Sequence, residues 1–83
     1  MTLEELKIEL AAILGEEEAP HANWESVEFL SEQTYLRLNE FGTPQDFPRE
    51  DVIGYLGGFV RRRLDKRFGE QQRQWLRSYL RAS

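Results

Sequence analysis

The residues of this 83-residue chain that are best suited to chemistry or recognition are charged, and they are unevenly distributed along it. Residues 1–51 carry thirteen acidic and three basic side chains, whereas residues 52–83 carry eight basic and two acidic ones. The net charge of −4 therefore conceals a negative first part and a positive last part. Such polarity suits the recognition of a charged partner, or the neutralisation of one part of the fold by another.

Few residues have the types and spacing that catalysis requires. The only histidine, His21, lies in a predicted loop beside Pro20, and one histidine near glutamates is a weak basis for a zinc site. The absence of cysteine excludes cysteine nucleophiles, thiolate ligands and disulfides. Gly54, Gly57 and Gly58 lack the Lys-Ser/Thr pair that follows the glycines of a phosphate-binding loop. We therefore predict a non-catalytic protein with no metal and no cofactor.

The basic residues near the C-terminus could contact nucleic acid. They recur along two predicted helices joined by a turn at Phe68 and Gly69, an outline similar to a helix-turn-helix. The residues that this interpretation assigns to nucleic-acid contact are Arg62, Lys66, Arg73, Arg77 and Arg81. In the competing interpretation, these cations stabilise helix ends and neutralise the acidic part of the fold or of a dimer. Nucleic-acid binding ranks second because the acidic residues 1–51 would repel phosphate.

An acidic and aromatic face is predicted on the second helix. On a helical wheel, Phe29 and Leu36 point away from the expected core stripe and are surrounded by glutamates. The residues assigned to this face are Glu25, Glu28, Phe29, Glu32, Tyr35 and Leu36. If the face is exposed, aromatic anchors within a polar rim give it the character of an interface hot spot. If the helix is central, the same residues pack against another helix and the glutamates meet arginines.

These two surfaces lead to a functional prediction. We expect a protein-interaction module, namely an adaptor, an inhibitor or a regulatory subunit, whose acidic face binds a protein partner, with a basic partner fitting best. A nucleic-acid-binding protein that uses the basic helices is the alternative. The charge polarity also leaves a homodimer open. No stretch approaches the ~20 apolar residues of a membrane span, and the acidic segment of residues 1–5 does not resemble a signal peptide. We therefore expect a cytoplasmic location.

Helices must position these residues, because apolar residues recur at spacings of three and four and no segment alternates like a strand. We predict one all-α domain over residues 1–83, a compact bundle or orthogonal array of four main helices. The first helix spans residues 2–14, begins with a capping box at Thr2 and ends at Gly15. An exposed acidic linker at residues 16–22 follows it.

The remaining boundaries follow from caps and helix breakers. The second helix spans residues 24–41, with Asn23 as its N-cap, and a turn follows at residues 43–47. The third helix begins near Pro48 and reaches residue 67, with a kink at Gly57 and Gly58. Its expected apolar stripe consists of Val52, Ile53, Leu56, Phe59, Val60 and Leu64. The last helix spans residues 70–81.

Overall fold

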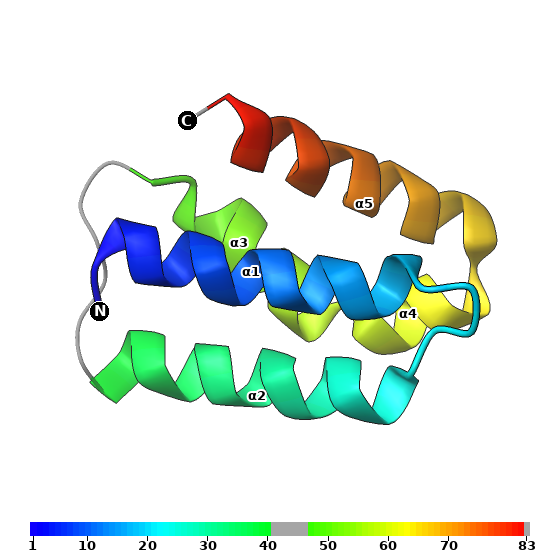
Figure 1. Cartoon of the computed structure of the whole chain (residues 1–83), viewed down its shortest axis with the longest axis horizontal. Coiled ribbons are helices and arrows are strands. Elements are labelled where there is room, and N and C mark those ends of the chain that lie inside the picture. The colour runs from blue at the N-terminus through cyan, green and yellow to red at the C-terminus, as the bar shows by residue number, and fades with distance from the viewer. Residues whose placement is uncertain (41–46, 83) are drawn as a thin grey trace.

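The computed structural model of the chain describes residues 1–40 and 47–82. Within this part the backbone forms five helices and no strand, which confirms the all-α prediction. The helices are α1 (Leu3–Glu18), α2 (Trp24–Glu40), α3 (Arg49–Gly57), α4 (Phe59–Leu64) and α5 (Lys66–Arg81). In Figure 1, α1 lies between α2 and α5, and α3 and α4 cross behind it. The predicted end of the second helix at Phe41 and most of the predicted turn at residues 43–47 lie outside the described residues.

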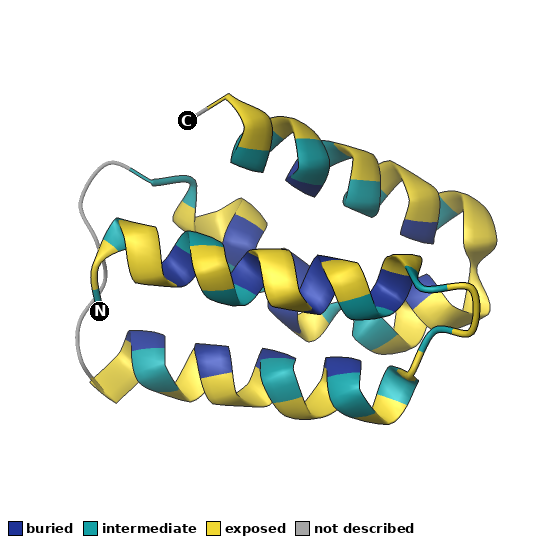
Figure 2. Ribbon diagram, in the orientation of Figure 1, coloured by how far each residue is buried: buried dark blue, intermediate teal, exposed yellow. Residues whose placement is uncertain are grey.

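The core is built from the inward faces of these helices. Figure 2 shows the buried positions of α1 and α2 recurring along the sides that the two helices turn toward their neighbours. This recurrence follows from the spacing of three and four along the sequence, which places apolar side chains on one helix face. The apolar residues that are buried are Leu6, Leu10, Ile13, Leu14, Val27, Leu38, Val52, Tyr55, Leu56 and Leu76.

The N-terminal caps of α1 and α2 agree with the sequence. The Glu5 backbone N–H donates to Thr2 Oγ1 at 3.1 Å, and the Ser26 backbone N–H donates to Asn23 Oδ1 at 3.2 Å. Each bond satisfies a backbone donor that has no partner within its own helix. The side chains of Thr2 and Asn23 therefore fix where α1 and α2 begin.

The C-terminal end of α1 differs from the prediction. The helix continues through Gly15 to Glu18, so the expected exposed linker is wrong for residues 16–18. Gly15 sits within the helix, and a methyl group added there would meet nothing within 4 Å, so this glycine does not serve as a stop. The helix ends because Pro20 disfavours the helical conformation at Ala19, whose φ of −60° and ψ of 149° are extended. The extra turn places Glu17 on the inner face of α1, where it is buried.

The third predicted helix divides into two helices at Gly58, which accounts for the fifth helix. Gly58 separates α3 from α4, and its N–H donates to the Tyr55 carbonyl at 3.2 Å. The predicted apolar stripe is wrong beyond this break, because Val60 is 56% exposed and Leu64 79%. Both side chains lie on the surface instead of in the core.

The boundary between α4 and α5 also differs from the prediction. The connection is the single residue Asp65, whose carboxylate accepts a bond from the Phe68 N–H at 3.1 Å, and no turn forms at Phe68 and Gly69. Gly69 instead lies inside α5 and is buried. A Cβ at Gly69 would stand 2.7 Å from the Arg62 carbonyl oxygen, so this glycine allows α4 and α5 to approach closely.

Candidate functional site

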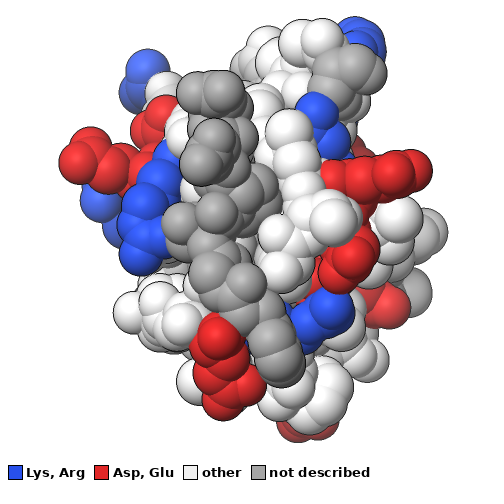
Figure 3. All heavy atoms as spheres, turned by 90° about the vertical axis from the view of Figure 1, so that its left-hand side faces the viewer, with Lys and Arg blue, Asp and Glu red and all other residues white. Residues whose placement is uncertain are grey.

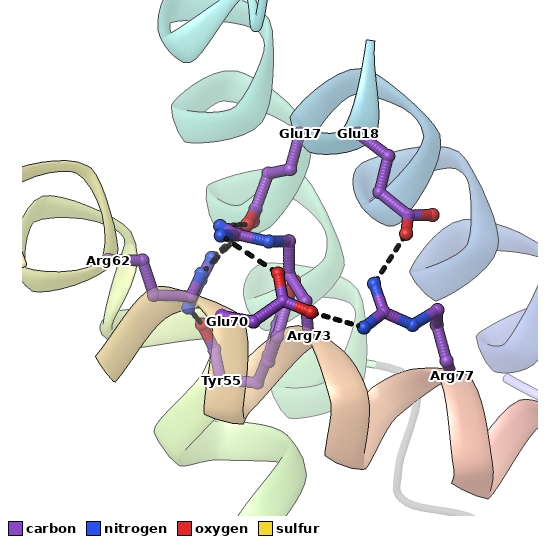
Figure 4. A network of polar contacts seen from close by, with 7 residues as sticks. All are labelled: Glu17, Glu18, Tyr55, Arg62, Glu70, Arg73 and Arg77. Carbon is purple, nitrogen blue, oxygen red and sulfur yellow. Dashed lines mark hydrogen bonds and ion pairs between the residues drawn. The ribbon is translucent and has the colours of Figure 1, made fainter. Parts of the chain in front are cut away.

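A buried ion pair joins the C-terminal end of α1 to α4. Arg62 is only 2% exposed, and its Nε donates to both carboxylate oxygens of Glu17 at 3.1 Å, while Nη2 donates to Oε1 at 2.7 Å. Its Nη1 donates to the Tyr55 carbonyl, and its guanidinium carbon lies 3.7 Å from the centroid of the Tyr55 ring (Figure 4). The structure therefore places Arg62 in the interior instead of on a nucleic-acid-binding surface.

Two arginines of α5 extend this network toward the solvent. Arg73 lies 3.4 Å from a Glu17 oxygen, and Arg77 contacts Glu18 at 2.5 Å and Glu70 at 2.6 Å (Figure 4). The hydrogen bond from the Arg77 guanidinium lowers the pKa of Glu70 below its usual value. The basic residues of α5 thus neutralise acidic residues within the fold, as the competing interpretation predicted, although the carboxylates come from α1 and α5 and not from α2.

Tyr55 completes the interior of this network without offering acid–base chemistry. Its hydroxyl is buried beside the carboxylate of Glu17. Burial, reinforced by the negative charge of Glu17, raises the pKa of Tyr55 well above its usual value. A phenol that holds its proton so tightly is poorly matched to proton transfer near neutral pH. We therefore interpret Tyr55 and the Glu17–Arg62 pair as structural.

Four of the five residues assigned to nucleic-acid contact line one depression, namely Arg62, Lys66, Arg73 and Arg77, but they share it with the carboxylates of Glu17, Glu18 and Glu70. Arg62, Arg73 and Arg77 are engaged in the internal network. Lys66 and Arg81 are exposed, but they are the first and last residues of α5. The basic residues that remain exposed near the junction of α4 and α5 are Arg61, Arg63, Lys66 and Arg67.

Folding also mixes charges at the opposite end of the molecule. In the view of Figure 3, acidic and basic side chains alternate around the surface instead of separating into two fields. Arg37 of α2 pairs with two carboxylates of α1: it donates to Glu9 at 2.8 Å and lies 3.4 Å from Glu5. On this face of the molecule, the polarity of the sequence is therefore not reproduced as two separate fields of charge.

The acidic and aromatic face of α2 borders an apolar groove, which we call the α2–α3 groove. Tyr35 and Leu36 are 43% and 49% exposed on one wall, and the buried Leu56 contributes to its floor. The groove has a volume of about 500 Å³ and is lined by Ser31, Glu32, Tyr35, Leu36, Ile53, Leu56, Gly57 and Phe59. An apolar groove between helices is a suitable site for the apolar face of a partner helix.

A second depression, the α2–α4 hollow, continues from the groove beyond Phe59, which lines both. Its volume is about 330 Å³, and its lining consists of Trp24, Glu25, Glu28, Phe59, Val60, Arg63 and Leu64. The glutamates belong to α2, whereas Arg63 belongs to α4. The hollow therefore has an acidic wall and a basic wall.

The six residues predicted on the α2 face are distributed over three depressions. Glu32, Tyr35 and Leu36 line the α2–α3 groove, and Glu25 and Glu28 line the α2–α4 hollow. Phe29 is 61% exposed and lines a third hollow toward Glu16 of α1. Among the described residues, no ion pair involves a glutamate of this face. The structure therefore leaves the whole face accessible, but it does not gather it into one hollow.

The sequence does not predict that Glu17 is buried in an ion pair, because the acidic run around it resembles an exposed linker. The signal that could have found it is Pro20, whose restriction of Ala19 predicts a helix end after Glu18.

Within the described residues, no group of three or more potential metal ligands is arranged to hold a metal ion, and no helix is long and apolar enough to cross a membrane. Comparison with protein-family models, curated proteins and solved structures finds no match to this chain.

Proposed function

We propose that the chain is a non-catalytic protein-interaction module of the cytoplasm, serving as an adaptor, an inhibitor or a regulatory subunit. In this proposal it binds an amphipathic helix of its partner in the α2–α3 groove. The observation that carries the proposal is the apolar lining of this groove, next to two large side chains, Tyr35 and Leu36, that remain substantially exposed.

The exposure of Tyr35 and Leu36 favours a role in binding over a role in folding. The neighbouring positions Thr34 and Leu38 are each 1% exposed, so α2 already contributes a closely packed face to the core. Burial of a large apolar side chain contributes about 1.5–3 kcal/mol. For Tyr35 and Leu36 much of this free energy is not gained in the isolated chain and becomes available when a partner covers them.

The charges of α2 define the chemistry of the partner. Glu32 lines the groove, is exposed and makes no ion pair among the described residues. A partner helix with leucine-like anchors at spacings of three, four and seven would fill the groove, and lysine or arginine beside those anchors would meet the Glu32 carboxylate. We therefore propose a basic amphipathic helix as the ligand.

The groove supports this function better than the basic helices support nucleic-acid binding. Three of the five cations assigned to phosphate or base contact are held by carboxylates of the same chain. Releasing them would leave Glu17 buried without a partner, at a cost of several kcal/mol. Binding in the α2–α3 groove requires no such rearrangement.

Site-specific photo-crosslinking tests the proposal. A photoreactive amino acid is placed at Leu36, and at the exposed α5 residue Ser78 as a control, and each protein is irradiated in an extract of the cells that express it. We expect a discrete adduct from position 36 that is absent from position 78 and weakened by Glu32→Lys. Equal labelling at both positions would contradict docking in the groove, and an adduct insensitive to Glu32→Lys would contradict the basic partner.

A further inference from the structure

The α2–α4 hollow combines opposite charges with exposed apolar side chains. Glu25 and Glu28 form its acidic wall and Arg63 its basic wall. Val60 and Leu64 lie in the same depression and are 56% and 79% exposed, although both belong to a helix that packs against α2 and α5. Leu64 is the most exposed large apolar side chain among the described residues.

The charges on the two walls are not used within one protomer. Among the described residues, no ion pair involves Glu25, Glu28 or Arg63. Arg62, the residue immediately before Arg63, is in contrast engaged by Glu17 and by the Tyr55 carbonyl. The hollow therefore presents two carboxylates and one guanidinium that are available to a second molecule.

A two-fold axis would make this face complementary to itself. In an isologous interface each surface patch meets the same patch of the second protomer, so an acidic wall beside a basic wall meets its opposite on both sides of the axis. The exposed apolar side chains between the walls would then cover one another. We propose that the α2–α4 hollow is the contact face of a homodimer, in which Glu28 of each protomer faces Arg63 of the other.

The same features argue against other occupants. An anionic surface, whether a membrane or a nucleic acid, would be attracted by Arg63 but repelled by Glu25 and Glu28 in the same depression. A uniformly basic partner would meet the reverse conflict. A second copy of this chain supplies both signs of charge in the required arrangement, together with an apolar centre.

The expected dimer is weak and sensitive to salt. The molecule measures 32 × 25 × 19 Å along its principal axes, so one face of it can contribute only a small interface. Interfaces at the lower end of the specific range bury about 1,200 Å² in total and are often transient. We expect a dissociation constant that rises with ionic strength, because part of the attraction is electrostatic.

Sedimentation velocity of charge-reversed variants tests the inference. Glu28→Lys and Arg63→Glu each place like charges opposite one another twice, so each should weaken self-association by roughly tenfold or more. An equimolar mixture of the two variants should form a heterodimer, because both pairs of opposing residues are again of opposite sign. The double variant Glu28→Lys/Arg63→Glu should self-associate like the original protein.

Matched controls separate the interface from effects on folding. Glu4→Lys and Arg81→Glu reverse exposed charges outside the hollow and should leave association unchanged, while circular dichroism verifies that every variant is folded. A chain that remains monomeric up to millimolar concentration, or a dimer insensitive to both reversals in the hollow, would overturn the inference. Neither result affects the photo-crosslinking from Leu36, because Leu36 lies outside the hollow and the proposed function is tested separately.

Discussion

Two regions of this molecule use glutamate and arginine in opposite ways. At the end of α1, Glu17 and Arg62 are buried against each other and hold three helices together. Along α2, Glu28 and Glu32 are exposed and make no ion pair within the described chain. The residue types are similar, but Glu17 lies on the inward face of its helix and the α2 glutamates on an outward face. The position of a charge relative to the core therefore decides whether it stabilises the fold or remains available for recognition.

The largest expected effect comes from breaking the buried pair on one side. Glu17→Ala would leave Arg62 buried without its carboxylate partner, so we expect a loss of about 3–5 kcal/mol in the free energy of unfolding measured with urea. Replacing both partners, as Glu17→Leu/Arg62→Met, removes the uncompensated charge and should recover most of this loss. A small effect of Glu17→Ala alone would show that water reaches the pair.

A matched pair of leucines on α2 sharpens the comparison. Leu38 is 1% exposed and Leu36 is 49% exposed on the same helix. Leu38→Ala should lower the free energy of unfolding by about 2–5 kcal/mol, as for other large-to-small core substitutions. Leu36→Ala should change it by less than about 0.5 kcal/mol while reducing capture of the partner. Comparable losses of stability in the two variants would contradict the exposed groove.

Two glycines test how closely the network region is packed. Gly69→Ala should destabilise the protein by about 1–3 kcal/mol, because its Cβ would lie 2.7 Å from the Arg62 carbonyl oxygen. Gly15→Ala adds a methyl group to α1 with nothing within 4 Å, and should stabilise by about 0.5–1 kcal/mol. Thermal unfolding of both variants is the measurement, and a stabilising Gly69→Ala would refute the close approach of α4 and α5.

The smallest expected effect at neutral pH concerns the Tyr55 hydroxyl. Because burial raises the pKa of Tyr55 in the folded state, its contribution to stability is complete below the usual tyrosine pKa of 10.0 and declines as pH rises above it. Tyr55→Phe removes a single buried hydroxyl and keeps the packed ring, so stability at pH 7 should change by no more than about 1.5 kcal/mol. Urea unfolding between pH 7 and pH 11 should show a smaller alkaline loss in the variant than in the original protein.

Much of the fold follows from local sequence signals. The periodicity of apolar residues predicts the helices, and Asn23 and the Gly57–Gly58 pair correctly indicate where α2 begins and where the third predicted helix breaks. The predicted roles of Gly15 and Gly69 are wrong, because a glycine does not by itself mark the end of a helix and both residues lie inside one. Only the structure shows what each glycine does: Gly69 allows a close approach to the Arg62 carbonyl, whereas Gly15 is an interior position of α1 with open space around it.

Less of the candidate site than of the fold could be predicted from the sequence. The wheel of α2 indicates that Phe29 and Leu36 point away from the core, and the structure shows both to be exposed. The partition of charges could not be predicted, because Glu17 and Arg62 are 45 residues apart and meet only after α1 and α4 have packed. Arg62 and Arg63 look equivalent in the sequence, yet the direction of α4 after Gly58 buries one and exposes the other.

Arg62 and Arg63 provide the most direct test of the central claim, which is that some charged residues of this molecule stabilise the fold and others remain accessible for recognition. The measurement is the free energy of unfolding of Arg62→Ala and Arg63→Ala in the same buffer at pH 7. The buried network predicts a loss of about 3–5 kcal/mol for Arg62→Ala, which strands Glu17, and a change within about 0.5 kcal/mol for Arg63→Ala. Similar effects of the two substitutions would contradict the division between an internal network and an exposed recognition surface.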